Sequence, residues 1–408
     1  MISPSNNQLP LSLAISHQSF DHLIVGTQPN DQMIVNELNV PKLSLIPHDV
    51  KPVGTQPHNH DYLTDENSLN HNKPKSRQQR RMILYTKQTA GQLGLYNPSF
   101  SILTLDKKKN ENASWVKLPS HKKLPRPYVL INRHNKPYLP IFMYQIHPFS
   151  SPTPVFHKLQ NLIITLNKLA NNRQNITTNS DMLDGIMKGI GFCQGSYSGK
   201  SAGVYARKAG LTKKKIDDDN EQWSALQEFG DLIHSRIQGF SNNALKDNQE
   251  IINAANLPNF SQLEWHSNKS PNFKTYSNVI VTLNGFHNKP HTDNNDINSW
   301  NYGIFSFINK SNFIPIPTVF TPSGHGLSFP NHKFIFDFSK KEGIVEILWK
   351  TSEILHQTTK PAKELLENES ITHFGCSFQI NKKLLLTGQK LKQLSSEEIK
   401  TKVNGPIM

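Results

Sequence analysis

The second half of the chain contains a succession of short hydrophobic runs that are separated by turns and not by helices. The runs are Val279–Leu283, Tyr302–Ile308, Phe313–Phe320, Lys333–Phe338 and Gly343–Trp349. Short strands with this spacing are typical of an antiparallel sandwich or jelly roll. The sequence therefore predicts a jelly-roll core over this part of the chain.

A candidate metal site follows the first of these strands. In the segment Gly285–Asp293, His291 and Asp293 are two residues apart, the spacing at which side chains of one strand share a face. An imidazole and a carboxylate on one strand, joined by a histidine from a distant strand, form the facial triad that binds Fe(II) and leaves three positions open. His-x-Asp is a weak motif in a chain with 18 histidines, so a surface pair is the default until a third ligand is found.

Four histidines compete for the place of the third ligand. In a jelly roll the strand after Trp349 lies beside the strand that carries His291, which favours His356. His325 and His332 stand in turns that contain glycine and proline, and we expect them at the rim of the barrel. His287 is the other rival.

The first half of the chain is expected to add helices and further strands to this core, which makes the fold class α+β. Short β-like runs are Ser101–Leu105, Tyr128–Asn132 and Pro140–Ile146. Hydrophobic spacing predicts helices over Val155–Leu169, Met182–Met187, a stretch from Asp217–Asp219 to Ile237, and Asn242–Ala255. In the third of these, the three aspartates can cap the N-terminus, and His234 is interpreted as a packed core residue.

The segment Gly191–Tyr205 contains Gly199-Lys200-Ser201, which resembles the end of a phosphate-binding P-loop. A P-loop needs four residues between its first glycine and the Gly-Lys pair, and Gly195 leaves only three, so we reject this reading. The glycines indicate a flexible loop instead, in which Lys200, Arg207 and Lys208 face a polyanion.

Composition indicates a folded region preceded by a polar arm. Only 36% of the 408 residues are hydrophobic and the mean hydropathy is −0.54, and residues 1–80 show no helical or strand period, which predicts a disordered arm. The arm ends in Lys73–Arg81, where five of nine residues are basic. This run suits nuclear import or phosphate binding, and a solvated charge run explains it equally well.

Charge and cysteine content indicate which kind of partner the protein binds and in which compartment of the cell it lies. Lysine and arginine number 45 against 31 acidic residues, a net charge of +14 that favours nucleic acid as a partner. Cys193 and Cys376 are too few for a disulfide scaffold and suit a reducing compartment. We see no secretory signal and no apolar run of membrane-spanning length, so we expect a nuclear protein without a membrane anchor.

Several of these segments together resemble a known family of oxygenases. Gly285–Asp293, Tyr302–Phe305 and Gly343–Lys350 are similar to the Tet-like branch of the Tet/JBP oxygenases, a branch that is expanded in fungal genomes. The similarity also includes Gly191–Gly195, the loop from Lys200 to Lys208, and Phe374–Ile380. It covers about residues 185–385, which divides the chain into an arm (1–80), a leading region (81–184), an oxygenase domain (185–385) and a tail (386–408).

The resemblance implies a double-stranded β-helix that uses Fe(II), 2-oxoglutarate and O₂ to oxidise the C5-methyl group of a pyrimidine in DNA, typically 5-methylcytosine. The target base must leave the helical stack to reach the metal, so a pocket for a flipped base is expected. Asp296 matches an acidic position that some members direct at the base, and a carboxylate can accept a hydrogen bond from cytosine N4. A solvated loop aspartate is the alternative for this residue.

One position departs from the family pattern. Where the family places an arginine that holds the distal carboxylate of 2-oxoglutarate, this chain has His373. A histidine cannot supply a permanently charged bidentate fork. We assign cosubstrate binding to His373, Ser377 and Asn288, with Lys382 as an alternative cation.

Two other functions stay open at this stage. One is a nucleic-acid-binding relative that keeps the fold and has lost cosubstrate binding and catalysis. The other is a small-molecule cupin, which leaves the basic loop at 200–208 without an explanation.

Overall fold

The computed structural model describes ten stretches of the chain, and everything below concerns these stretches. They are residues 101–105, 116–117, 128–132, 140–176, 181–195, 200–265, 273–298, 300–317, 325–338 and 342–404. The predicted disordered arm and its basic end at Lys73–Arg81 lie outside the described residues.

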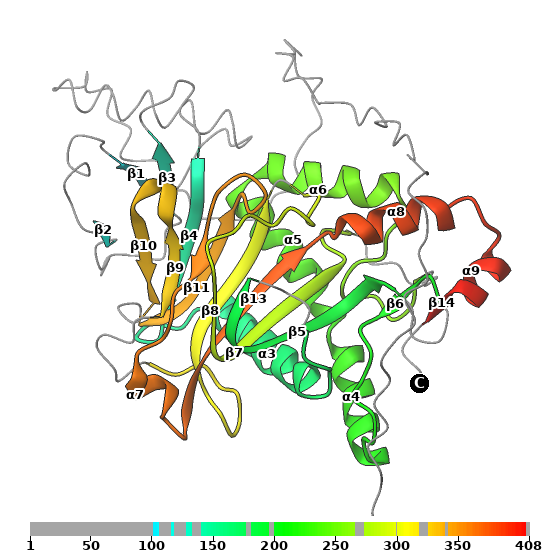
Figure 1. The fold of residues 1–408 in the computed structure, drawn as a ribbon, viewed down its shortest axis with the longest axis horizontal. Coiled ribbons are helices and arrows are strands. Elements are labelled where there is room, and N and C mark those ends of the chain that lie inside the picture. The colour runs from blue at the N-terminus through cyan, green and yellow to red at the C-terminus, as the bar shows by residue number, and fades with distance from the viewer. Residues whose placement is uncertain are drawn as a thin grey trace, which may run out of the picture. The chain divides into compact units, whose positions relative to one another are not determined.

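Two β-sheets form the centre of the described region (Figure 1). The larger sheet contains, in spatial order, β1 (Ser101–Leu105), β3 (Tyr128–Asn132), β4 (Pro140–Pro148), β11 (Gly343–Trp349), β8 (Asn301–Asn309), β13 (Ile371–Gln379), β7 (Asn278–Asn288), β5 (Met182–Gln194), β6 (Ala202–Val204) and β14 (Val403–Asn404). The smaller sheet contains β12 (Gln357–Thr358), β9 (Gly326–Phe329), β10 (Phe334–Asp337) and β2 (Val116–Lys117).

The chain winds between the two sheets as a double-stranded β-helix. In the larger sheet β11, β8, β13 and β7 are neighbours and every pair is antiparallel. In the smaller sheet β12, β9 and β10 are antiparallel neighbours. After β8 the chain forms β9 and β10 in the smaller sheet, returns to the larger sheet for β11, crosses to the smaller sheet for β12 and returns to the larger sheet for β13. This alternation is the jelly roll that the spacing of the strands predicts.

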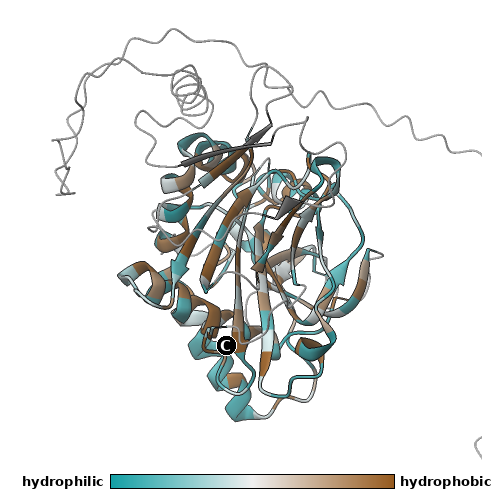
Figure 2. Ribbon diagram, turned by 90° about the vertical axis from the view of Figure 1, so that its left-hand side faces the viewer, coloured by the Kyte–Doolittle hydropathy of each residue, from teal (hydrophilic) through white to brown (hydrophobic). Residues whose placement is uncertain are grey.

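The core has two layers because the strands of the larger sheet bury both faces. Along β11, Val345 and Trp349 point to the smaller sheet and join its aromatic cluster, whereas Ile344 and Leu348 point to the helices. Figure 2 shows the resulting hydrophobic strands inside the molecule and hydrophilic outer faces on the helices. A sheet that is covered on both faces can hold a site between its two layers away from bulk water.

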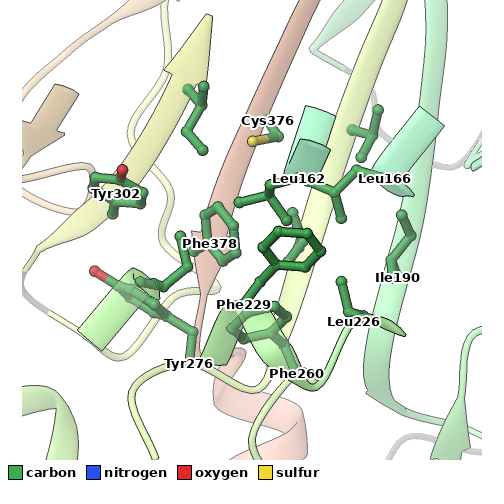
Figure 3. Packing of buried hydrophobic residues seen from close by; sticks show 14 of the residues in the cluster. Leu162, Leu166, Ile190, Leu226, Phe229, Phe260, Tyr276, Tyr302, Cys376 and Phe378 are labelled. Atoms are coloured by element: carbon green, nitrogen blue, oxygen red, sulfur yellow. The ribbon is translucent and has the colours of Figure 1, made fainter. Parts of the chain in front are cut away.

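Helices cover the face of the larger sheet that is turned away from the smaller sheet. They are α3 (Pro154–Asn171), α4 (Lys213–Ala225), α5 (Glu228–Phe240), α6 (Asn242–Ala254), α8 (Lys382–Leu391) and α9 (Ser396–Lys402). The short helix α7 (Lys363–Leu366) lies against β7 and β13, and the 3-10 turn η2 (Pro330–His332) joins β9 to β10. The hydroxyl of Thr153 accepts a hydrogen bond from the amide of Phe156 at 3.2 Å and caps α3. Figure 3 shows Leu162 and Leu166 of this helix in one hydrophobic cluster with Ile190, Leu226, Phe229, Phe260 and Phe378.

The helices predicted over Val155–Leu169 and Asn242–Ala255 are confirmed as α3 and α6. The helix predicted over Met182–Met187 is wrong, because this segment begins the strand β5, which pairs with β7. The helix predicted from Asp217–Asp219 to Ile237 is two helices, α4 and α5, and the residue that caps α4 is Thr212.

Two further local predictions are wrong. Much of Gly191–Tyr205 is not a loop, since β5 continues to Gln194 and pairs with β6. Phe313–Phe320 contains no strand in its described part, where only a single bridge joins Ile308 to Pro315. Proline has no amide hydrogen for a strand ladder, which explains the second result.

Candidate active site

The metal-binding candidates come from two segments that run side by side at the edge of the smaller sheet. His291 and Asp293 lie after the end of β7, so the prediction that they share the face of one strand is wrong. The amide and carbonyl of His291 instead exchange hydrogen bonds with those of His356 at 2.9 Å each, as an isolated bridge. The amide of Asp293 donates to the carbonyl of Thr351 at 2.9 Å. Backbone hydrogen bonds thus fix the positions of His291, Asp293 and His356, although His291 and His356 are 65 residues apart in the sequence.

The ligand atoms of His291, Asp293 and His356 all lie within 4.8 Å of one another. The Nε2 atom of His291 is 3.3 Å from Oδ1 of Asp293, and the Nε2 atom of His356 is 3.6 Å from Oδ2 of the same carboxylate. No other cluster of this kind occurs among the described residues. The structure therefore brings together the three residues that the sequence selects.

Backbone carbonyls fix the tautomer of both histidines. The Nδ1 atom of His291 is 2.8 Å from the carbonyl oxygen of Lys289, and that of His356 is 2.8 Å from the carbonyl oxygen of Ile354. A carbonyl oxygen only accepts, so each Nδ1 carries a hydrogen. In the neutral ring Nε2 then has the lone pair for a ligand bond, whereas in the protonated ring the Nε2–H group donates to Asp293. The contact of Nδ1 with a carbonyl is the one that metal-binding histidines normally make.

The electrostatics of the triad suit a cation. Burial opposes the charged form of Asp293, yet hydrogen bonds with His291 and His356 hold the pKa of its carboxyl well below the usual range. Burial also disfavours protonated His291, and pairing with Asp293 outweighs it and raises the pKa of that imidazole. Two imidazoles and one carboxylate with open positions are the donor set of non-haem Fe(II), so the residues fit this metal.

The rival histidines lie elsewhere. His325 is only 2% exposed and stacks on His373 with ring centroids 3.9 Å apart, so the prediction that it lies at the rim is wrong. The Nδ1 atom of His287 is 2.9 Å from the carbonyl oxygen of Gly285. His332 lies in the 3-10 turn η2. None of the three belongs to the described metal cluster.

A cavity of about 490 Å³ opens beside the triad. Its apolar wall includes Phe286, Phe305, Leu327 and Trp349, and its polar wall includes Asn288, Asn294, Asn295, Thr358, Ser377 and Asn381. Within the stretches that the structure describes, the wall contains no lysine and no arginine. The cavity can therefore hold a flat, hydrogen-bonding group beside the metal, and it offers an anion hydroxyls and amides in place of a fixed positive charge.

The family model of the Tet-like 2OG-Fe(II) oxygenase superfamily matches residues 156–361, a range that includes all three residues of the triad. The chain belongs to this superfamily. Its members use Fe(II), 2-oxoglutarate and O₂. The match does not distinguish a fungal branch, which stays a prediction.

Solved structures add likenesses at low identity. A prolyl-4-hydroxylase from Pseudomonas putida aligns with 10% identity and a TM-score of 0.30, covering 59% of this chain and 93% of its own. OsALKBH1 aligns with 10% identity and a TM-score of 0.29, covering 60% and 98%. An oxidoreductase of the 2OG-Fe(II) oxygenase family from Burkholderia pseudomallei aligns with 10% identity and a TM-score of 0.31, covering 59% of this chain and 88% of its own. No curated protein matches the chain.

Of the three residues predicted to bind 2-oxoglutarate, Asn288 and Ser377 line the cavity and His373 does not. Asn288 lines the cavity, and its Oδ1 accepts a hydrogen bond from the amide of Thr358 at 2.7 Å. Ser377 lines the cavity too, and its buried hydroxyl has no hydrogen-bond partner among the described residues. An unpartnered hydroxyl in the wall is a place where a carboxylate oxygen would bind.

His373 lies deeper than the cavity wall. It is 1% exposed, and its Nε2 has no hydrogen-bond partner in the described part of the chain. Burial, and then the neighbouring His325 and His287, hold the pKa of this imidazole well below its usual value. His373 is therefore neutral unless an anion lies beside it, and its role in cosubstrate binding stays a prediction. Lys382, the alternative cation, is exposed at the start of α8.

Asp296 is not a solvated loop residue, because it is 8% exposed and lines the cavity. Its Oδ2 accepts a hydrogen bond from Nδ2 of Asn301 at 2.6 Å. Burial, and next the charge of Asp293, raise the pKa of Asp296 well above its usual value. A divalent cation on the triad would cancel the second of these effects.

The predicted nucleic-acid-binding residues divide into two kinds. Arg207 forms an ion pair with the buried Asp219, with Nε 2.6 Å from Oδ2. The Nζ atom of Lys200 donates to the carbonyl oxygen of Thr401. Lys208 is exposed. Binding of DNA by these residues stays a prediction, and Lys208 is the one most available to a phosphate.

Sequence reasoning missed two residues beside the triad. Tyr205 lines the cavity, and a Cβ atom on Gly189 would lie 2.3 Å from its ring. Asn301, which holds Asp296, is fully buried. Gly189, which leaves room for the Tyr205 ring, is a local sequence signal for that residue. No periodic pattern in the sequence indicates a role for Asn301.

Proposed function

We propose that this protein is an Fe(II)- and 2-oxoglutarate-dependent dioxygenase that oxidises the C5-methyl group of a pyrimidine in DNA, with 5-methylcytosine as the first candidate. The observation that supports it most is the triad of His291, Asp293 and His356, which carries correctly oriented lone pairs and faces a cavity large enough for a base. Membership of the Tet-like superfamily supports the choice of reaction.

When bound, the cofactor and cosubstrates supply the oxidation: one atom of O₂ enters the methyl C–H bond to give a hydroxymethyl group, and the other leaves in succinate as 2-oxoglutarate loses CO₂. The protein's residues position the reactants. His291, Asp293 and His356 would hold the metal, and Phe305 and Trp349 keep one side of the cavity apolar and exclude water.

Ser377 and His373 lie on the same strand and on the same face of it, four residues apart. Both have a polar atom without a hydrogen-bond partner among the described residues. We assign the distal carboxylate of 2-oxoglutarate to this face of β13. His373 would gain its proton together with the anion, since a neighbouring negative charge stabilises imidazolium.

DNA is the proposed partner and the nucleus the proposed location. The net charge of +14 supports attraction to phosphates, and exposed Lys208 lies three residues from Tyr205 in the cavity wall. No helix among the described residues is long and apolar enough to cross a membrane.

The test has two stages. Anaerobic addition of Fe(II) and 2-oxoglutarate should produce a metal-to-cosubstrate charge-transfer absorption in the wild type and none in Asp293→Ala. His332→Ala is the matched control and should keep the absorption, since this histidine lies outside the metal cluster. Oxygen and a duplex with 5-methylcytosine should then give succinate and an oxidised base in equal amounts, measured by mass spectrometry.

A second candidate function is a nucleic-acid-binding protein that has lost catalysis. The observation that favours it is the cavity wall without lysine or arginine in the described stretches, together with the burial of His373. This alternative predicts binding of DNA with no charge-transfer absorption at millimolar 2-oxoglutarate. A protein that gives the absorption and forms succinate excludes it.

A further inference from the structure

The strand β5 carries a solvent-exposed leucine at the edge of the cavity. Leu183 is 54% exposed, the largest value among the exposed large hydrophobic side chains of the described stretches. It lies in the sequence between Asp181 and Met187, which both line the cavity. A single exposed leucine is ordinary on a protein surface, so the backbone around Leu183 decides whether this one has a role.

The backbone around Leu183 departs from a regular strand. The pairing of β5 with β7 shifts its register between Met182 and Asp184 and again between Asp184 and Ile186. Gly185, within the second shift, has a φ of +86°, and its amide donates a hydrogen bond to Oδ1 of Asp184 at 2.7 Å. An added Cβ atom there would lie 2.2 Å from the amide nitrogen of Phe286, so only glycine fits. Such a bulge re-aims side chains and is frequent beside active sites.

The neighbouring strand β7 contributes to the same irregular segment. Asn284 and Gly285 of this strand have φ values of +52° and +80°. Phe286 and Asn288, which follow them, line the cavity. Because the residues around Leu183 line the cavity and its own side chain is exposed, this leucine lies where the cavity meets solvent.

A base that leaves a duplex to enter the cavity leaves a gap between the two flanking base pairs. Leucine is one of the apolar side chains that proteins insert between base steps. We infer that Leu183 is a wedge that enters this gap while the target base occupies the cavity, and that the bulge in β5 holds it in place for paired DNA. The inference rests on the proposed function, which names DNA as the substrate.

The surroundings of Leu183 suit a base stack better than a protein partner. A protein-docking surface needs several exposed apolar side chains side by side. The sequence neighbours of Leu183 are instead the half-buried Met182 and the exposed, charged Asp184. One apolar side chain between such neighbours can enter the apolar space between two base pairs while the polar groups stay in water.

The test compares two DNA probes that carry 5-methylcytosine and, next to it, 2-aminopurine, whose fluorescence is quenched by stacking. In the paired probe the methylated base is opposite guanine, so its extrusion leaves a gap. In the bulged probe the methylated base has no partner, and the flanking base pairs stack on each other once it leaves. A wedge therefore stabilises only the complex with the paired probe, whereas a residue that supports the fold affects both complexes alike.

Binding of the wild-type chain should raise the fluorescence of the paired probe. Full burial of a leucine side chain is worth roughly 10- to 100-fold in affinity, and Leu183 is already half-buried, so Leu183→Ala should weaken binding of the paired probe about 10-fold. It should also lower the rise in fluorescence at saturation and leave the affinity for the bulged probe unchanged. Leu183→Met keeps a long apolar side chain and should behave as the wild type, whereas Leu183→Gln keeps the length without the apolar end and should behave as Leu183→Ala.

Leu386→Ala is the matched control, since Leu386 on α8 is 46% exposed and does not line the cavity. It should leave affinity and fluorescence unchanged for both probes. Thermal unfolding checks that each variant is folded.

Equal affinity of the wild type and Leu183→Ala for the paired probe would overturn the inference, and so would an equal loss on both probes or a failure of Leu183→Met to bind as the wild type does. A wild type that binds neither probe, or binds without a rise in fluorescence, overturns it as well. The proposed function fails separately. A rise in fluorescence that depends on Leu183, with no succinate formed, refutes turnover alone, and succinate formation on paired DNA with binding that does not depend on Leu183 refutes only the wedge.

Discussion

Arg236→Met is predicted to lower the free energy of unfolding strongly, although Arg236 is not one of the residues that line the cavity. Glu346 on β11 is 0% exposed and receives two hydrogen bonds from Arg236 of α5, at 2.9 Å from Nε and 2.7 Å from Nη2. Tyr302 and His147 also contact this carboxylate. Removing the arginine leaves a buried carboxylate without its permanent cation.

A buried charge that loses its partner typically costs about 3–5 kcal/mol. Arg236 is only 17% exposed, so solvent screens the pair little. Because Tyr302 and His147 still contact the carboxylate of Glu346, we expect the loss of unfolding free energy to lie near the lower end of this range, at about 3 kcal/mol. Adding Glu346→Gln to Arg236→Met removes the stranded charge and should recover part of this loss.

The pair also predicts a dependence on pH. Burial alone would raise the pKa of Glu346, but Arg236 and then His147 hold it well below the usual value. A group whose pKa is lower in the folded state stabilises the protein above the unfolded pKa of about 4.3, and this contribution is lost as the pH falls. The wild type should therefore lose stability relative to the double variant on acidification below about pH 4.

Urea unfolding measures these free energies. Lys246→Met is the matched control, since this lysine is 76% exposed and its nearest carboxylate oxygen, in Glu250, is 3.8 Å away. It should change the stability by less than about 1 kcal/mol. Glu346 lies on the helix side of β11, opposite Trp349 in the cavity wall, so the charge-transfer absorption should survive in folded Arg236→Met. A loss below about 1 kcal/mol in Arg236→Met would refute the reasoning.

Four further predictions concern the site. Mn²⁺ at 100 times its dissociation constant should stabilise the wild type by about 2.7 kcal/mol in thermal unfolding and leave His356→Ala unchanged; equal stabilisation of both excludes His356 as a ligand. His373→Arg should tighten 2-oxoglutarate by about 1.5–3 kcal/mol in calorimetry, and wild-type affinity should fall as the pH rises because only imidazolium carries charge; tight, pH-independent binding by the wild type contradicts this. Gly189→Ala should displace Tyr205 and lower the melting temperature, because the added Cβ lies 2.3 Å from the ring, and an unchanged melting curve would show that the ring is not packed there. Lys208→Ala should lower the slope of DNA affinity against salt concentration by roughly 1 without unfolding the protein, and an unchanged slope would show that Lys208 contacts no phosphate. Arg207→Ala should instead destabilise the fold, because Arg207 is paired with the buried Asp219.

The sequence alone determined those features that depend on near neighbours. The period of Val155–Leu169 predicted α3, and the hydrophobic run Gly343–Trp349 coincides with β11 residue for residue. The two-residue spacing of His291 and Asp293 selected two of the three candidate ligands. In each case the residues concerned are close in the sequence, so the pattern of residue types contains the information.

Only the tertiary structure decided which distant segments meet. Four histidines fitted the third position, and the backbone pairing of His291 with His356 selected one of them. Met182–Met187 became a strand because β7 offers it a partner, an interaction that no local period records. The stacking and burial of His325 and His373 likewise depend on segments from separate parts of the chain. Strand pairing and burial are set by contacts across the fold, and the free energy of those contacts overrides local propensity.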